Sequence, residues 1–159
     1  RRLRIYFMEE NKIINRNLIF LDEPKVDKEQ IIKFFANKLK ENHYIDDENT
    51  FYKAVMKREY EVPTAIGYDI AIPHGKSNTV LQPFIAFLRT QNKFKWTEGY
   101  EDDVQLIFQI GVPDKGNEKL HLKFISEVSK KLLDEHFREK LKTFSDVEQI
   151  YELLNSIEI

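Results

Sequence analysis

Residues 58–77 read REYEVPTAIGYDIAIPHGKS. The mostly apolar run from Ile66 to Ile72 has Gly67 near one end and Pro73 after the other, and this pattern predicts a short buried strand. Proline has no N–H to donate to a strand ladder, so we expect pairing to stop at Pro73. His74 is therefore predicted to lie at a strand end, just after a stiff residue.

A histidine in this position is suited to being presented to another molecule. Imidazole titrates near neutrality, with a pKa of about 6.5, and it can act as a nucleophile without a metal or a second base. Gly75 lets a phosphate group or a partner's backbone approach closely. Pro-His-Gly alone is more often a surface turn, however, so the tripeptide does not by itself indicate chemistry.

Composition limits the class of protein. The 159 residues suffice for a single domain, and a net charge of −2 gives no bulk attraction to nucleic acid or to an anionic membrane. We find no apolar run of about 18 residues and no signal-peptide pattern. Cysteine is absent, which excludes disulfides and thiolate ligands and indicates a reducing cytoplasm. The four histidines show no close ligand spacing, so no metal site is expected.

Apolar runs and helical periodicity give the remaining elements. We expect strands at 17–21, 84–88 and 104–112, and a loop from 91 to 103. Helices are expected from Asp27 to Asn42, after Asp46-Asp47, from an Asn117 cap, and at the C-terminus after a Ser145–Glu148 capping box. The buried stripe of the third helix is predicted to contain Leu120, Phe124, Val128 and Leu132, widened by Ile125 and Leu133.

Helices and apolar strands alternate along the chain, which favours an α/β fold with helices on both faces of a sheet. The polar segment 76–82 is too short to connect two parallel neighbouring strands. The sheet is therefore predicted to be mixed, in a three-layer α/β/α arrangement.

A longer pattern includes Glu59, then six residues, Ile66-Gly67, two residues, and the segment from Ile70 to Gly75. This pattern resembles, at every position, the phosphorylation-site signature of the fructose/mannitol-type (type-2) enzyme IIA domains of the bacterial phosphoenolpyruvate-dependent sugar phosphotransferase system (PTS). The resemblance continues through Trp96, Val104–Pro113, His121-Leu122 and Asp134–Leu141. It implies the family's mixed α/β fold over residues 17–159, with residues 1–16 as a lead-in or linker remnant.

The resemblance also implies a phosphotransferase chemistry with a phosphohistidine intermediate. His74 matches the histidine that accepts a phosphoryl group from the phosphocarrier protein HPr and passes it to a cysteine of an enzyme IIB domain. His121 matches the family's second active-site histidine, which assists transfer, and Arg58 matches the arginine that binds the phosphoryl group. The family needs no cofactor or metal, binds no nucleic acid, inserts in no membrane and works in the cytoplasm.

Two functions remain open at this point. One is a transport component for sugar uptake. The other is an EIIA-like domain of a transcriptional regulator or antiterminator, in which phosphorylation of His74 signals sugar supply. The chain begins with Arg1, and we interpret it as cut from a longer polypeptide, because such domains are often fused to other regulatory or PTS modules. The sequence indicates neither the sugar nor the oligomeric state.

Overall fold

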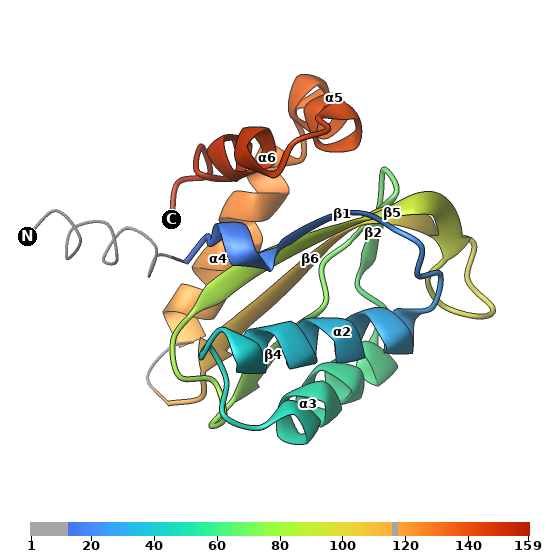
Figure 1. Cartoon of the computed structure of the whole chain (residues 1–159). Coiled ribbons are helices and arrows are strands. Elements are labelled where there is room, and N and C mark those ends of the chain that lie inside the picture. Colours follow the sequence, from blue (N-terminus) through green and yellow to red (C-terminus); the bar gives the residue numbers. More distant parts are fainter. Residues whose placement is uncertain (1–12, 116–117) are drawn as a thin grey trace, which may run out of the picture.

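The computed structural model describes residues 13–115 and 118–159, and these form one mixed sheet with helices on both faces (Figure 1). In chain order the elements are η1, a 3₁₀ helix (Arg16–Leu18), β1 (Ile19–Glu23), α2 (Lys28–Glu41), α3 (Glu48–Glu61), β2 (Ala65–Gly67), β3 (Ile70–Ala71), β4 (His74–Ser77), β5 (Phe84–Lys95), β6 (Asp103–Pro113), α4 (Glu118–Lys131), α5 (Glu135–Thr143) and α6 (Val147–Leu154).

The sheet has the order β1-β5-β6-β3-β2, and β4 also pairs with β6. β3 and β4 run parallel to β6, whereas β5 is antiparallel to it, and β1 is parallel to β5. Helices α2 and α3 cover one face, and α4, α5 and α6 lie over the other (Figure 1). The predicted mixed sheet in a three-layer α/β/α fold is confirmed.

Aspartate is the N-cap residue of most of the described α-helices. Asp27, Asp47, Asp134 and Asp146 each accept a hydrogen bond from a backbone N–H in the first turn, which satisfies a donor that has no partner within the helix. The predicted Ser145 cap is wrong by one residue, because Asp146 is the N-cap of α6 and binds the N–H of Glu148. The predicted Asn117 cap lies outside the described residues.

The predicted strand 66–72 is instead a hairpin. β2 and β3 are antiparallel, and the two residues between them, Tyr68 and Asp69, have positive φ angles of 56° and 64°. This is the backbone of the tight turn that matches the right-handed twist of paired strands. Ile66, expected to be buried, is 45% exposed.

Pro73 interrupts the ladder without ending it. β3 stops at Ala71 as expected, but pairing with β6 resumes at His74, which lies opposite Ile110. The Pro73 carbonyl still accepts a hydrogen bond from the Ile110 N–H at 3.0 Å, since proline lacks only the donor. His74 is therefore the first residue of a second short strand, not the last residue of the preceding one.

Three smaller differences concern the ends of elements. The loop expected at 91–103 is shorter, because β5 continues to Lys95 and β6 starts at Asp103. Leu133, placed in the buried stripe, is 75% exposed beyond the end of α4. Ile14, within the expected lead-in, is buried, and the Ile13 carbonyl accepts from the Ile85 N–H at 3.0 Å.

No helix in residues 13–115 and 118–159 is long and apolar enough to cross a bilayer. The core is instead divided between the two faces of the sheet. On the α2/α3 face Phe84 packs edge-on against Tyr44 and Phe51.

Gly111 makes room for the Phe84 ring. A Cβ atom at residue 111 would lie 2.3 Å from Phe84 Cζ, a distance that forces the ring or the strand to move. We expect Gly111→Ala to lower the free energy of unfolding by about 1–3 kcal/mol, as overpacking of a core does, measured by urea denaturation. The Phe84→Leu background is the control, because the ring that the added Cβ meets is removed there. An equal cost of Gly111→Ala in both backgrounds would contradict this account.

Candidate active site

His74 is the first residue of β4, and its ring is held by a hydrogen bond to a backbone carbonyl two residues earlier. Its Nδ1 lies 2.8 Å from the carbonyl oxygen of Ile72. A carbonyl oxygen only accepts, so the proton of the neutral ring lies on Nδ1 and the lone pair lies on Nε2. The residue is 8% exposed. The local fold therefore fixes both the tautomer and the nitrogen that is free to react.

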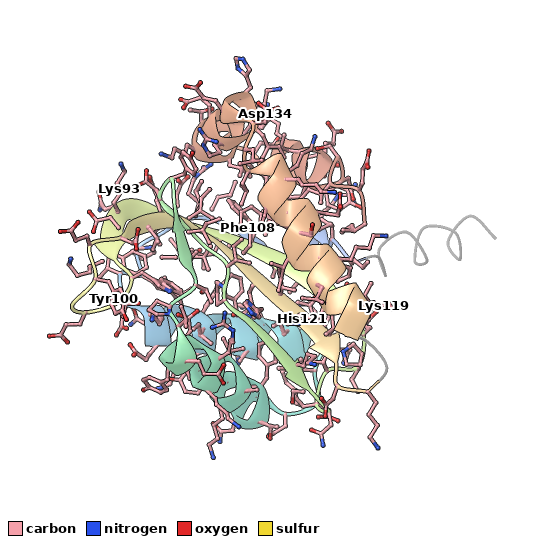
Figure 2. All side chains as sticks on the ribbon, turned by 180° about the vertical axis from the view of Figure 1, so that it is seen from behind. Lys93, Tyr100, Phe108, Lys119, His121 and Asp134 are labelled. Atoms are coloured by element: carbon pink, nitrogen blue, oxygen red, sulfur yellow. The ribbon has the colours of Figure 1, made fainter. Side chains whose placement is uncertain are left out.

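His121 comes from α4, which covers the face of the sheet to which His74 points. It lies in the first turn of α4, near Lys119 in Figure 2. His74 pairs with Ile110 and so points to the face that α4 covers. The two imidazole rings lie with their centroids 5.0 Å apart at an angle of 58°. The structure thus brings together the two histidines that the sequence singled out, 47 residues apart in number.

His121 also has an unsatisfied ring nitrogen. Its Nε2 is buried and has no hydrogen-bond partner in the described part of the chain. A buried polar atom without a partner carries a desolvation cost. A group with oxygen acceptors that entered the space beside the two rings would relieve it.

Both histidines are tuned towards the neutral form. Burial lowers the pKa of His74 below its usual value, and the nearby charge of Arg58 lowers it further, while the bond to Ile72 and the charge of Glu59 oppose the shift. Burial lowers the pKa of His121 to about 4, with contributions from His74, Lys76 and Arg58. At neutral pH the pair therefore provides a nucleophile that needs no deprotonation.

Arg58 lies in the last turn of α3, partly buried, with its Nη1 donating to the Val62 carbonyl at 2.7 Å. Its positive charge contributes to the lowered pKa of both histidines. A guanidinium has five N–H donors in a planar fork, so donors remain for an anion.

The sequence analysis missed the part that Glu59 plays. Glu59 was noted only as a position of the signature, but it is buried, at 3% exposed. It accepts from Thr64 N (3.3 Å), from Thr64 Oγ1 and from Trp96 Nε1 (3.0 Å), and it pairs with Lys28 Nζ at 3.1 Å. Trp96 itself is buried.

Helical spacing could have revealed this carboxylate. The buried residues of α3 are Phe51, Val55, Met56 and Glu59. Glu59 is four residues after Val55 and eight after Phe51, on the buried stripe rather than on the solvent face. A carboxylate on such a stripe requires partners.

Among the described residues, no group of three or more His, Cys, Asp or Glu side chains is arranged to hold a metal ion. The site consists of two neutral imidazoles, one guanidinium and backbone groups, which suits a phosphoryl group bound by charge and hydrogen bonds.

The lowered pKa of His121 can be tested through the pH dependence of the protein's stability. Its folded pKa of about 4 lies below the unfolded value of about 6.5, so the unfolded chain binds the proton first as pH falls from 6.5 towards 4. The free energy of unfolding should therefore decrease over that window, by an amount on the order of 1 kcal/mol because the ring is only partly buried. We expect His121→Gln to lose less stability than the wild type between pH 7 and pH 5 in thermal unfolding.

His43→Gln, which removes an exposed histidine, is the control for the loss of a histidine as such. An equal loss for His121→Gln and the wild type would show that His121 titrates near its ordinary pKa.

Comparison with known families identifies the chain. Residues 12–157 match the family model described as phosphoenolpyruvate-dependent sugar phosphotransferase system, EIIA 2. The chain belongs to this family. Accordingly it is a phosphotransferase component with a role in phosphoryl relay.

Individual relatives agree with this membership. The PTS EIIA chain is 32% identical over 140 residues to a protein named PTS system fructose-specific EIIA component from Haloferax volcanii, covering 88% of this chain and 90% of the relative. Other relatives are longer: the PTS system fructose-specific EIIABC component of Mycoplasma pneumoniae is 35% identical over 133 residues, which are 83% of this chain but 19% of that protein. The domain therefore also occurs inside multidomain proteins.

Solved structures show the same fold. The nitrogen regulatory protein IIA-Ntr from Neisseria meningitidis superposes with a TM-score of 0.81 at 27% identity, covering 89% of this chain and 96% of that one. Enzyme IIA for mannitol from Escherichia coli, solved in complex with phosphorylated enzyme IIB, gives 0.75 at 26% identity, covering 88% and 95%. The second structure shows an EIIA domain pairing with an EIIB domain.

Proposed function

We propose that this PTS EIIA domain carries a phosphoryl group on Nε2 of His74, between phospho-HPr and a fructose- or mannitol-type enzyme IIB domain, in the cytoplasm. The observation that carries the proposal is the hydrogen bond from His74 Nδ1 to the Ile72 carbonyl, which leaves Nε2 as the free nucleophile next to His121. Family membership supports the same role.

The reaction transfers one phosphoryl group twice. In the first step the Nε2 lone pair forms a bond to phosphorus while the bond to the donor breaks, and the electron pair leaves with the donor. The Nδ1 proton stays hydrogen-bonded to Ile72, which stabilises the positive charge that develops on the ring. In the second step a cysteine thiolate attacks phosphorus, the N–P bond breaks, and the electron pair returns to Nε2.

The site can neutralise the transferred group. Phosphoryl transfer depends mainly on positioning and on stabilising charge spread over the phosphoryl oxygens. Arg58 supplies a permanent positive charge and free donors. A protonated Nε2 on His121 would donate to a phosphoryl oxygen and thereby acquire its missing partner.

Exposed apolar side chains adjoin the site residues in the chain and suit transient protein docking. Val62 follows α3, whose last turn contains Arg58, Ile66 lies on the hairpin before His74, and Leu122 follows His121. All three are more than two-fifths exposed, at 61%, 45% and 65%. Phospho-HPr and the IIB domain would then approach one rim in turn.

The direct test is incubation with phospho-HPr followed by a IIB domain. We expect an adduct on the protein that is labile in acid and stable in base, as a phosphoimidazole is, and its loss when IIB is added. An adduct stable in acid would indicate a hydroxyl acceptor and contradict the proposal.

A regulatory role is the second candidate, and the structural likeness to the nitrogen regulatory protein favours it. The two roles differ in the second step. A transport component passes its phosphoryl group to IIB, whereas a regulatory domain keeps it in the presence of IIB. The transfer measurement above decides between them.

His121 is predicted to assist transfer without carrying the phosphoryl group. We expect His121→Ala to be phosphorylated at His74 but to pass the group to IIB about ten times more slowly, the effect of losing one hydrogen bond to a charged group. Rapid-quench measurement of both steps tests this. His43→Ala is the control, and wild-type rates in both directions for His121→Ala would leave that histidine with a structural role only.

A further inference from the structure

Glu59 joins four separate segments of the chain. Its carboxylate contacts Lys28 at the start of α2, Thr64 ahead of β2, and Trp96 in the loop between β5 and β6, while Glu59 itself belongs to α3. Lys28 Nζ also donates to Thr97 Oγ1 at 2.7 Å. All of the donors that reach Glu59 come from buried side chains or from buried backbone.

Hydrogen bonds joined through the backbone of Thr64 and of Ile72 lead from this carboxylate to His74. Glu59 accepts from both the N–H and the hydroxyl of Thr64. The Thr64 carbonyl accepts from the Ile72 N–H at 3.0 Å. The Ile72 carbonyl then accepts the Nδ1 proton of His74 at 2.8 Å. We call Glu59, Thr64 and Ile72 the Glu59 linkage.

We propose that Glu59 is a positioning residue for His74: through the Glu59 linkage it holds the Ile72 carbonyl where it fixes the ring's tautomer and orientation. The proposal rests on the proposed function for its effect on transfer rate, but not for its effect on the ring. Glu59 touches neither His74 nor the reacting atoms, so it is not a catalytic residue.

The chain geometry explains why such support is needed. The tight turn at Tyr68-Asp69 leaves β2 and β3 only three and two residues long, so a few ladder bonds hold the hairpin. Thr64 lies just outside β2 and Ile72 just outside β3, and their hydrogen bond closes the open end of the hairpin. The two hydrogen bonds that Glu59 accepts from Thr64 fix Thr64 to α3, and therefore fix the open end of the hairpin.

The next peptide is held separately from the opposite side. Gln109, fully buried on β6, donates from Nε2 to the Pro73 carbonyl at 3.2 Å, and the Ile110 N–H donates to the same oxygen. The sheet therefore fixes the Pro73–His74 peptide, whereas the Glu59 linkage holds the Ala71–Ile72 peptide, whose N–H is the donor to the Thr64 carbonyl. Loss of the Glu59 linkage should leave His74 on the sheet with its ring free to choose a tautomer.

Stability alone is a weak explanation for Glu59. Buried ion pairs often contribute no more stability than well-packed apolar side chains would, because both ions must be desolvated. Here both carboxylate oxygens bind donors, and two of the bonds go to the single residue that leads to His74. This is the arrangement expected of a group that orients its neighbours.

The test reads the His74 ring before any phosphoryl transfer. Imidazole ¹⁵N chemical shifts in the unphosphorylated protein report the Nδ1–H and Nε2–H tautomers. We expect a predominantly Nδ1–H ring in the wild type and a mixture in Glu59→Gln and Thr64→Val. Thr64→Ser, which keeps the hydroxyl that Thr64→Val removes, should keep the wild-type tautomer.

The same variants are compared in transfer from phospho-HPr. We expect Glu59→Gln to slow the maximal rate between about tenfold and a hundredfold, the effect of a misplaced reacting group, at an unchanged half-saturating concentration of phospho-HPr. Arg89→Gln is the control: Arg89 is also buried and donates to Asp22, Leu141 and Phe144, but has no contact with the Glu59 linkage. It should lower stability and leave tautomer and rate unchanged.

A wild-type tautomer in Glu59→Gln, or in Thr64→Val if Glu59→Gln does not fold, would overturn the proposal. So would a tautomer change in Arg89→Gln equal to that in Glu59→Gln, since the effect would then follow stability. Failure of the proposed function looks different: the tautomer would still change in Glu59→Gln, but His74→Ala would be phosphorylated like the wild type.

Discussion

His74→Ala is expected to abolish acceptance of the phosphoryl group, with a rate at least about a thousandfold below that of the wild type, because removal of a nucleophile removes the covalent step itself. The neighbouring His121 should not substitute, since it projects from α4 and not from the start of β4, and its ring centroid lies 5.0 Å from that of His74. Labelling by phospho-HPr, followed by gel electrophoresis under alkaline conditions in which a phosphoimidazole is stable, gives the rate directly.

His43→Ala and His136→Ala are the controls for the loss of a histidine. Both side chains are exposed, and neither is among the groups that shift the pKa of His74 or of His121. Each variant should be labelled at the wild-type rate, and a melting temperature for His74→Ala near that of the wild type would show that the fold is intact. Labelling of His74→Ala at the wild-type rate would refute the assignment of the phosphoryl carrier.

The layers of the fold could be predicted from the sequence because the central strands are buried on both faces. The run from Val104 to Val112 and the run from Phe84 to Leu88 are almost continuously apolar, and both lie in the middle of the sheet. The same criterion failed for Ile66–Ile72, where apolar side chains conceal a turn. Tyr68 and Asp69 adopt positive φ without the Asn-Gly pattern by which such turns are usually found.

The candidate site, like the fold, could be predicted from the sequence only in part. The sequence predicted His74, His121 and Arg58 only through family resemblance, because no local pattern indicates that residues 74 and 121 lie side by side. Their proximity depends on the parallel pairing of β4 with β6 and on the packing of α4, which are long-range features. The tautomer of His74 depends on a carbonyl two residues away and could not be predicted from residue types.

Arg58→Ala is expected to slow phosphorylation of His74 by about ten- to a hundredfold, since removal of one charge-assisted contact costs about 1.5–3 kcal/mol where it acts in the transition state. Stability should change little, because the loss is one exposed hydrogen bond to the Val62 carbonyl. Arg58→Lys should keep part of the rate, because an ammonium supplies the charge without the planar fork. Rates with phospho-HPr and thermal unfolding curves are measured for both variants.

Lys57→Ala is the matched control, since it removes one positive charge from the exposed side of the same helix turn. If net charge alone steers the donor to the domain, Lys57→Ala and Arg58→Ala will slow the reaction equally, and both effects will fade at high salt. If Arg58 binds the phosphoryl group, only Arg58→Ala will lower the maximal rate, and salt will not restore it. A large fall in melting temperature at an unchanged rate would instead assign Arg58 to the end of α3, where it caps the helix through Val62.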